Sequence, residues 1–412
     1  MKVLIVSQYF WPETFCINAL ARSLRERGVE LTVLTGKPNY PEGNIFEGYS
    51  AFGVCREHYA DIEILRLPTV SRGQRSSLRL FLNYISFIIV SAVLGPMVLR
   101  GRAFDVIFVY APSPILQALP AILLARLKRA RLVVWVQDLW PESLKATGHV
   151  NSRLLLAVTA RVVRMIYRAS DRILVQSQAF VAPVSALTED ANKVRYYPNL
   201  YQVTEQCEVS SRAGELTANL KSHFSVVFAG NLGTAQSLDT IVGAARELLS
   251  DPDIRIVLVG SGRLDQWLLE QRKALGLTNL MLPGRFDPSD LPAIFEAAKA
   301  LLVTLKPEPA FGLTIPSKVQ AYLAAGRPIL ASLDGEGSRI IHEAKAGLCS
   351  EAGNAKALAE NVRRLWQMTP QERQELGQNG RHYFDRHFAP DVLTDELIKH
   401  FRELVDEGGV AA

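Results

Sequence analysis

The residues best suited to chemistry form a glycine-rich turn in the second half of the chain. The segment Phe228–Ser237 reads FAGNLGTAQS, with Gly230, Asn231, Gly233 and Gln236 between an apolar run and a helical stretch. Glycines allow tight backbone turns, and a helix N-terminus presents unpaired N–H groups to an anion. We interpret the turn as a diphosphate site; a plain strand-to-helix turn is the alternative interpretation.

Two further segments of the same half support this interpretation. Gly260-Ser261-Gly262 follows the next apolar run, and ligands collect beyond the carboxyl ends of strands in open parallel sheets. The segment from Lys306 to Lys318 places Ser317 and Lys318 in the first turn of a predicted helix, where the helix dipole disfavours a cation. A bound anion would explain Lys318, whereas a solvated surface lysine needs none.

Carboxylates and loops of the first half are candidates for an acceptor site. Asp138 and Glu142 follow an apolar run and could orient a hydroxyl or stabilise positive charge at a sugar carbon. They could equally be turn and helix-cap groups, an interpretation that suits Glu142 better. The loops that contain Glu13 and the pair Asn39 and Tyr40 suit contacts to an acceptor sugar, or are turns only.

The pattern around these residues predicts an α/β protein. Short β-branched runs alternate with longer helical stretches, which indicates parallel sheets covered by helices on both faces. We therefore predict two Rossmann-like, doubly wound parallel-sheet domains that face a cleft. The expected strands are 2–6, 30–34, 62–65, 106–109, 132–136, 172–175, 225–229, 255–259, 279–282, 300–303 and 328–331.

The alternation of expected strands and helices fades between Asn199 and Ser222, and this break divides the chain into two domains. We predict an N-terminal domain over residues 1–200, a linker over 201–222, a C-terminal domain over 223–388 and a last helix over 389–412. That helix has an apolar stripe, and the sequence does not say on which domain it docks.

Composition excludes several classes of protein. The chain has 412 residues, a net charge of +5 and 48% hydrophobic residues, which are the values of a globular protein with too weak a basic excess to indicate nucleic acid binding. The four cysteines (Cys16, Cys55, Cys207, Cys349) are scattered, and no Asp-x-Asp motif follows a strand, so we expect no metal site. The start, MKVLIVSQYF, predicts a strand rather than a signal peptide, and we expect a cytoplasmic protein. The first loop lacks G-x-G-x-x-G, which argues against a dehydrogenase.

The segment Leu78 to Leu99 is apolar enough for contact with a membrane. About 20 apolar residues can span a bilayer, but a spanning helix here would divide a Rossmann sheet. A helix lying at the interface, with Arg72, Arg75, Arg100 and Arg102 reaching lipid phosphates, fits better; a core-covering helix is the third possibility.

These segments together resemble glycosyltransferase family 4, and within it the bacterial O-antigen, capsule and colanic-acid-type enzymes, including N-acetylfucosamine transferases. The resemblance covers nearly the whole chain. It rests on YFWPE, KPNYPEGN, VQDLWPES, FAGNLGTAQSLD, LVGSGR, LPGRF and PSKVQAYLAAGRPI.

The resemblance implies a GT-B fold and a metal-independent, retaining transfer from a nucleotide sugar, usually a UDP-sugar. It implies that the diphosphate lies on the first glycine turn, that Leu282–Phe286 receives the base, and that Asp138 faces the acceptor or the transferred sugar. The nucleotide-sugar site would comprise Gly230, Asn231, Gly233, Gln236, Gly260, Arg285, Lys306, Ser317 and Lys318.

The chain departs from the family pattern in three places. Two glutamates usually flank the FGL segment with seven residues between them, and neither is present here; the second would fall near Ala321. Phe15-Cys16-Ile17 replaces the usual glycine pair of the first loop, and Gln137 stands where many members have histidine. These departures leave the donor sugar open.

We therefore expect an enzyme that extends a polyprenyl-diphosphate-linked saccharide, attached peripherally to the cytoplasmic face of a bacterial inner membrane, with Asp138 and Lys318 in the catalytic site. Two alternatives remain open from the sequence. One is a UDP-sugar epimerase of the same fold, and the other is a non-catalytic scaffold of a polysaccharide assembly complex.

Overall fold

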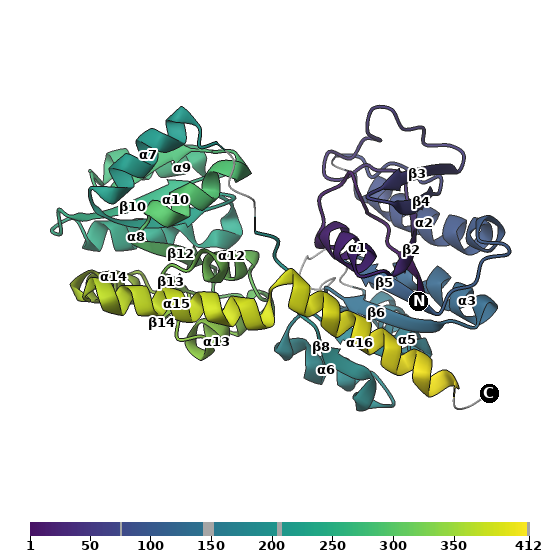
Figure 1. Ribbon diagram of the computed structural model, residues 1–412. Helices are drawn as coiled ribbons and strands as arrows, with labels where there is room; N and C mark the ends of the chain where they lie inside the picture. The colour runs from purple at the N-terminus through teal and green to yellow at the C-terminus, as the bar shows by residue number, and fades with distance from the viewer. Residues whose placement is uncertain (75, 143–151, 204–207, 410–412) are drawn as a thin grey trace. The chain divides into compact units, whose positions relative to one another are not determined.

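A computed structural model of the protein describes residues 1–74, 76–142, 152–203 and 208–409 (Figure 1). Arg75, Ser143 and Cys207 lie outside the described residues. The chain forms two compact units: unit 1 comprises residues 1–200 and 390–412, and unit 2 comprises residues 201–389. Each has its own sheet and its own hydrophobic core.

Unit 1 is built on an eight-stranded sheet with the order β3-β4-β2-β1-β5-β6-β7-β8. All neighbouring pairs are parallel except β3 with β4. The strands are β1 (Lys2–Val6), β2 (Glu30–Thr35), β3 (Cys55–Tyr59), β4 (Ile62–Arg66), β5 (Val106–Ala111), β6 (Arg131–Val136), β7 (Arg172–Val175) and β8 (Val194–Tyr196). The sequence analysis missed β3 and β8.

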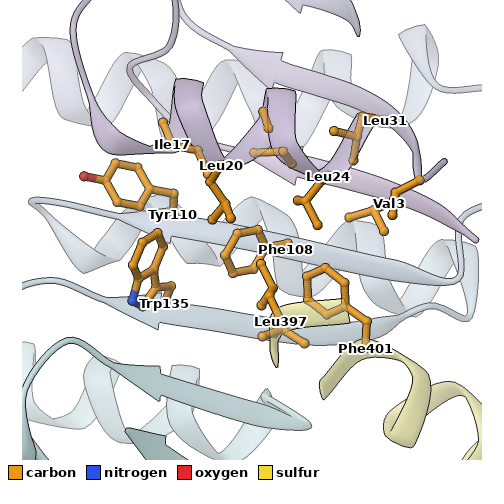
Figure 2. Packing of buried hydrophobic residues seen from close by; sticks show 14 of the residues in the cluster. Val3, Ile17, Leu20, Leu24, Leu31, Phe108, Tyr110, Trp135, Leu397 and Phe401 are labelled. Carbon is orange, nitrogen blue, oxygen red and sulfur yellow. The ribbon is translucent and has the colours of Figure 1, made fainter. Parts of the chain in front are cut away.

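One face of this sheet is covered by α1 (Cys16–Glu26) and α16 (Pro390–Gly409). Leu397 and Phe401 of α16 enter the same core as Leu20 of α1 and Phe108 and Trp135 of the sheet (Figure 2). This packing answers the question that the sequence left open, because the last helix returns to unit 1.

The other helices of unit 1 are α2 (Ser77–Val98), α3 (Ala118–Lys128), α5 (Arg153–Ala169) and the short α6 (Val181–Ser185). Helix α3 packs against β5 and β6, with α2 on one side of it and α5 on the other (Figure 1). Helix α2 begins at its N-cap Ser76, whose hydroxyl accepts from the backbone N–H of Arg79. It is the one helix of the described residues that is long and apolar enough to cross a membrane.

Unit 2 has a six-stranded parallel sheet with the order β11-β10-β9-β12-β13-β14. In sequence order this is 3-2-1-4-5-6, the order of a Rossmann sheet, so its switch point lies between β9 and β12. The strands are β9 (Phe224–Ala229), β10 (Ile254–Val259), β11 (Leu280–Gly284), β12 (Ala300–Thr304), β13 (Ile329–Ser332) and β14 (Gly347–Ser350). The sequence analysis missed β14.

The helices of unit 2 cover both faces of its sheet. They are α7 (Ser211–Lys221), α8 (Leu238–Glu247), α9 (Asp265–Ala274), α10 (Leu291–Ala297), α11 (Pro309–Gly312), α12 (Ser317–Ala325), α13 (Glu336–Glu343), α14 (Ala355–Gln367) and α15 (Pro370–His387). Helix α7 is a correction, because the segment was predicted to be part of a linker. Ser210 caps its N-terminus, and Ala213, Leu216 and Leu220 are buried.

Candidate functional site

In unit 2 the candidate residues gather where β9, β10 and β12 end. The turn that contains Gly230 follows β9, the turn that contains Gly260 follows β10, and the segment that begins near Lys306 follows β12. Because β9 and β12 flank the switch point of this sheet, their following loops form the expected ligand-binding edge.

The first two turns approach each other through glycine backbones. Gly230 and Gly260 have φ values of +141° and +146°, a region that other residues rarely adopt. A Cβ atom on Gly260 would lie 1.8 Å from the carbonyl oxygen of Gly230. Only glycine therefore fits at position 260 while the two turns stay in contact.

The Asn231 amide occupies the space that two further glycines leave. A Cβ on Gly233 would lie 2.7 Å from its Nδ2 atom, and a Cβ on Gly262 would lie 2.7 Å from its Oδ1 atom. Beside these turns is a pocket of about 550 Å³, lined by Gly230, Asn231, Val259, Gly260, Ser261, Gly262, Arg285, Phe286, Pro288 and Leu291. The two predicted glycine turns thus lie together on one pocket.

Lys318 lies beside the first glycine turn. Its Nζ donates to Oε1 of Gln236 at 2.6 Å and lies 4.8 Å from the centre of the Phe228 ring. A Cβ on Gly230 would be 3.1 Å from the Nζ. Burial lowers the pKa of Lys318 to about 8. A diphosphate at this turn would compensate the cost of burying the ammonium group, because an adjacent anion favours the charged form.

Lys306 and Ser317 belong to the segment after β12. The backbone N–H of Lys306 donates to the Ala235 carbonyl at 3.0 Å, which joins the segment to the first glycine turn. Ser317 is exposed in the first turn of α12, one residue before Lys318. The structure thus brings both residues to the same edge of the sheet as the turns.

Arg212 is a residue that the sequence analysis missed. From α7, it donates through Nη1 to the Arg285 carbonyl at 2.8 Å and through Nη2 to the Pro283 carbonyl. Its guanidinium carbon lies 4.2 Å from the centre of the Phe286 ring. Arg212 therefore fixes the loop predicted to receive the base, while the Arg285 side chain is exposed. The sequence contains no pattern that predicts the contact between residues 212 and 285.

In unit 1, Asp138 follows β6 and is largely buried. Burial raises its pKa, and a hydrogen bond from Ser113 opposes that rise. The Asp138 charge also acts on Tyr84 of α2 and on Tyr110 of β5. The carboxyl group is therefore close enough to these two tyrosines to interact with them electrostatically.

Glu13 has a different role from the predicted acceptor contact. It is 2% exposed; its Oε1 accepts from the backbone N–H groups of Asn39 and Tyr40 at 2.8 Å each, and its Oε2 accepts from Phe10 N–H at 3.2 Å. Burial raises the pKa of Glu13 to about 7 despite these three bonds. The side chain joins two loops, so it positions the site instead of lining it.

Asn39 is also buried and bonded within the protein. Its Nδ2 donates to the Lys37 carbonyl at 2.7 Å, and its Oδ1 accepts from the Arg72 N–H at 3.1 Å. Tyr40 keeps part of its surface exposed, and the Arg72 guanidinium lies 5.0 Å from its ring centre. Of this predicted pair, Tyr40 is the residue with exposed surface to offer an acceptor.

An aromatic cluster surrounds Tyr40. Tyr9 stacks on Phe15 with 5.5 Å between ring centres, and Tyr40 lies 5.6 Å from Tyr9 and 5.1 Å from Phe15. Helix α2 supports the cluster, because the Tyr9 hydroxyl donates to Oδ1 of Asn83 at 3.2 Å. Phe15, at a position where the family resemblance implies a glycine, is thus part of this aromatic cluster. Carbohydrates pack well on such aromatic and amphipathic surfaces.

Glu142 is exposed, and residues 143–151, which follow it, lie outside the described residues. Its predicted contact to an acceptor stays a prediction. Among the described residues, no group of three His, Cys, Asp or Glu side chains is arranged to hold a metal ion.

Comparison with protein families identifies both units. A model described as "Glycosyl transferase 4-like domain" matches residues 14–199, and one described as "Glycosyl transferases group 1" matches residues 217–383. The two matches together cover most of the chain and correspond to its two structural units.

The chain is also similar to individual proteins of known name. It is 25% identical over 344 residues to a putative colanic acid biosynthesis glycosyl transferase WcaI of Escherichia coli K12, covering 79% of this chain and 82% of the relative. It is 21% identical over 414 residues to an O-antigen chain mannosyltransferase C of Escherichia coli, covering 98% and 99%.

Among solved structures, Anabaena HepE in complex with UDP matches with a TM-score of 0.69 at 16% identity, over 98% of this chain and 100% of the other. Sucrose-phosphate synthase from Thermosynechococcus elongatus matches with a TM-score of 0.72 at 18% identity, over 98% and 99%. These likenesses show a shared fold.

Proposed function

Because this chain belongs to the group 1 glycosyl transferases and has their GT-B architecture, we propose that it transfers a sugar from a UDP-sugar to a lipid-linked saccharide. The sugar is of the N-acetylated hexosamine type, and the product belongs to a bacterial surface polysaccharide. The names of WcaI and of the O-antigen mannosyltransferase support that pathway class, and the UDP in the HepE complex supports the donor.

One observation carries the donor site. A partly buried lysine, Lys318, lies against the glycine turn that follows β9, at the switch point of a Rossmann sheet. A cation in the first turn of a helix, with a lowered pKa and beside a glycine turn, is suited to an anion with several oxygens. The diphosphate of a nucleotide sugar has that chemistry.

We propose the following transfer step. An acceptor hydroxyl oxygen bonds to the anomeric carbon as the bond from that carbon to the diphosphate oxygen breaks. Lys318 and the glycine turns stabilise the charge on the departing UDP. Retention follows if the hydroxyl attacks from the same face and gives its proton to the leaving diphosphate, with Asp138 orienting the acceptor.

We propose that α2 attaches the protein to the membrane. Its exposed apolar residues include Phe81, Ile89, Val93 and Met97, spaced by four or eight residues along one stripe. Polar residues of the same helix, Asn83 and Tyr84, face the aromatic cluster instead. A helix of this kind can lie in the interface of the cytoplasmic leaflet and bring the acceptor site to a polyprenyl-diphosphate-linked substrate.

An assay with separated substrates tests the proposal. Purified protein is incubated with UDP-, GDP- and dTDP-sugars, with and without a lipid-linked acceptor, and the products are analysed by mass spectrometry. We expect a glycosylated lipid product from a UDP-sugar. An epimerised sugar nucleotide formed without acceptor would indicate the epimerase alternative, and donor binding without turnover on any acceptor would indicate the scaffold.

We propose that the transfer needs no metal ion. Lys318 and backbone N–H groups take the place of a cation on the diphosphate, so activity in excess EDTA should equal that in buffer. The measurement is the initial rate of UDP release after prolonged dialysis against the chelator. Complete loss of rate, restored by Mn²⁺, would contradict this account.

Arg212→Ala should weaken UDP binding. The change removes both bonds to the loop carbonyls and the contact with Phe286, and we expect a loss of about 1–2 kcal/mol, the scale of one or two hydrogen bonds. Isothermal calorimetry measures it. Arg255→Ala is the matched control, because Arg255 also donates to two backbone carbonyls of unit 2, those of Pro252 and Ile254, at the start of β10. Equal losses in the two variants would remove Arg212 from the site.

A further inference from the structure

The two faces of unit 1 differ sharply in charge. Helices α2, α3 and α5, of 22, 11 and 17 residues, contain no aspartate or glutamate, although acidic residues make up 41 of the 412 in the chain. On the other face, the 20 residues of α16 include six acids: Asp391, Asp395, Glu396, Glu403, Asp406 and Glu407. The face made by α2, α3 and α5 is therefore selectively basic and apolar.

A groove between α3 and α5 concentrates this charge. It has a volume of about 790 Å³ and is lined by Arg126, Val158, Arg161, Val162, Arg164, Met165, Arg168 and Ala169. We call this set the arginine groove. Arg168 is paired with Glu189 at 2.8 Å, whereas no ion pair forms at Arg126, Arg161 or Arg164 within the described residues.

Apolar side chains surround these arginines on the same outer surface. Leu127 of α3 is 57% exposed, and Val158 and Met165 of α5 are each 50% exposed; Leu154 and Leu155, at the start of α5, are exposed as well. Nothing in the described part of the chain covers them. A surface that mixes exposed aliphatic groups with arginines, on helices that contain no acids, matches the chemistry of an anionic lipid surface.

We propose that the arginine groove binds the headgroup phosphates of anionic lipids and forms a second membrane contact beside α2. The inference rests on the proposed function in one respect, namely that the membrane is the one α2 is proposed to meet. Arginine suits the task because its planar guanidinium binds phosphate oxygens in pairs. Leu127, Val158 and Met165 then enter the acyl boundary while the arginines stay at headgroup level.

A second membrane contact fixes the orientation of unit 1 on the bilayer. One helix fixes the protein to a surface but leaves it free to rotate about the helix axis. Two contacts, on α2 and on α5 at the far side of α3, define a plane and hold unit 1 in one orientation, with the acidic α16 face directed away from anionic headgroups. The acceptor loops that pack on α2 then have a fixed height above the bilayer.

The test compares vesicle binding of two charge-matched variants. Arg161→Glu with Arg164→Glu alters the groove, and Arg272→Glu with Lys273→Glu makes the same charge change on the exposed surface of α9 in unit 2. Co-sedimentation with phosphatidylglycerol-containing vesicles should fall roughly 25-fold or more for the groove variant, since each basic residue contributes about fivefold near an anionic surface. The control should lose far less. Arg161→Lys with Arg164→Lys should keep most of the binding.

Further measurements distinguish a failure of this inference from a failure of the proposed function. The groove variant should keep wild-type UDP affinity and turnover on a water-soluble acceptor. A fall in either would overturn the inference, because the arginines would then act in folding or in the transfer itself. Replacing Ile89 and Val93 by serine tests α2 separately. If this variant loses vesicle binding and the groove variant does not, the inference about the groove is overturned while the proposed membrane contact of α2 stands.

Three further results would overturn the inference. They are equal losses in the groove and control variants, a change in oligomeric state of the groove variant in analytical ultracentrifugation, and binding of soluble glycerol phosphate as tight as that of vesicles. The second would indicate another copy of the chain as the partner of this face, and the third a site for a small phosphate.

Discussion

Gly260→Ala is expected to destabilise unit 2 by about 2–5 kcal/mol and to abolish UDP binding under ordinary assay conditions. The new Cβ would lie 1.8 Å from the Gly230 carbonyl oxygen, and the φ of +146° is unfavourable for alanine. The obstacle is backbone, so no side-chain rotation can relieve it. One of the two turns must move, and the pocket beside them changes shape.

Thermal unfolding with and without UDP measures both effects. A loss of this size should lower the melting temperature of unit 2 by roughly 5–15 °C and remove the stabilisation that UDP gives. Gly276→Ala is the matched control within the same unit, because Gly276 also has a positive φ, +59°, but open space where a Cβ would be. It should cost about 1–2 kcal/mol and leave the UDP response intact. Similar behaviour of the two variants would refute the importance of the contact between the turns.

The sequence predicts the parallel core strands well because they are continuous apolar runs. β1 and β7 have the predicted bounds, and most others differ by one or two residues. The missed strands lack that signal. β3 reads CREHY and pairs antiparallel at an edge, β8 has three residues, and β14 reads GLCS. Their conformation depends on pairing with a neighbour that the local sequence does not reveal.

Helix α7 shows the same limit in a different form. Its segment, SRAGELTANLK, has only a few apolar residues. It also contains one glycine, one threonine and one asparagine, which have low helix propensity. Tertiary contacts stabilise this helix: the Ser210 N–H and hydroxyl both donate to the Asp290 carboxylate at 2.9 Å, and α7 packs on α10. The linker prediction failed because no local pattern contains that information.

Within the site, backbone features were predictable and side-chain partners were not. Glycines at strand ends indicate turns whatever the rest of the fold does, so the pocket residues of unit 2 could be located from the sequence. Glu13 shows why a loop carboxylate could not be interpreted. Two of its three bonds to backbone N–H groups come from a second loop that begins 26 residues away, and only the structure reveals that Glu13 positions the loops.

Lys318→Met is expected to have opposite effects on ligand binding and on stability. UDP affinity should fall by about 1–3 kcal/mol, because the methionine keeps the aliphatic volume but removes a charge-assisted bond to phosphate. The ligand-free protein should become more stable at pH 7, since a buried ammonium no longer has to be accommodated. A fall in stability together with unchanged affinity would place Lys318 in the structural core rather than at the ligand.

The pH dependence follows from the lowered pKa of Lys318, about 8 in the folded protein against an ordinary 10.5. Between pH 8 and 10.5 the unfolded chain binds more protons than the folded one, so the stability of the ligand-free protein rises with pH over that window because of this group. Below pH 8 the cost of burying the charge is fully present. Lys318→Met should therefore be stabilised most at neutral pH and lose its advantage towards pH 10.5.

UDP binding should have the opposite slope. The diphosphate favours charged Lys318, so wild-type affinity should be nearly constant below pH 7.5 and fall about tenfold between pH 7 and 9 as the free lysine loses its proton. Lys318→Met should lack this slope, and any titration of UDP itself cancels in the comparison. Calorimetric titrations at half-unit steps measure both proteins. Parallel profiles would show that the proton is taken up elsewhere, and would remove Lys318 from contact with the diphosphate.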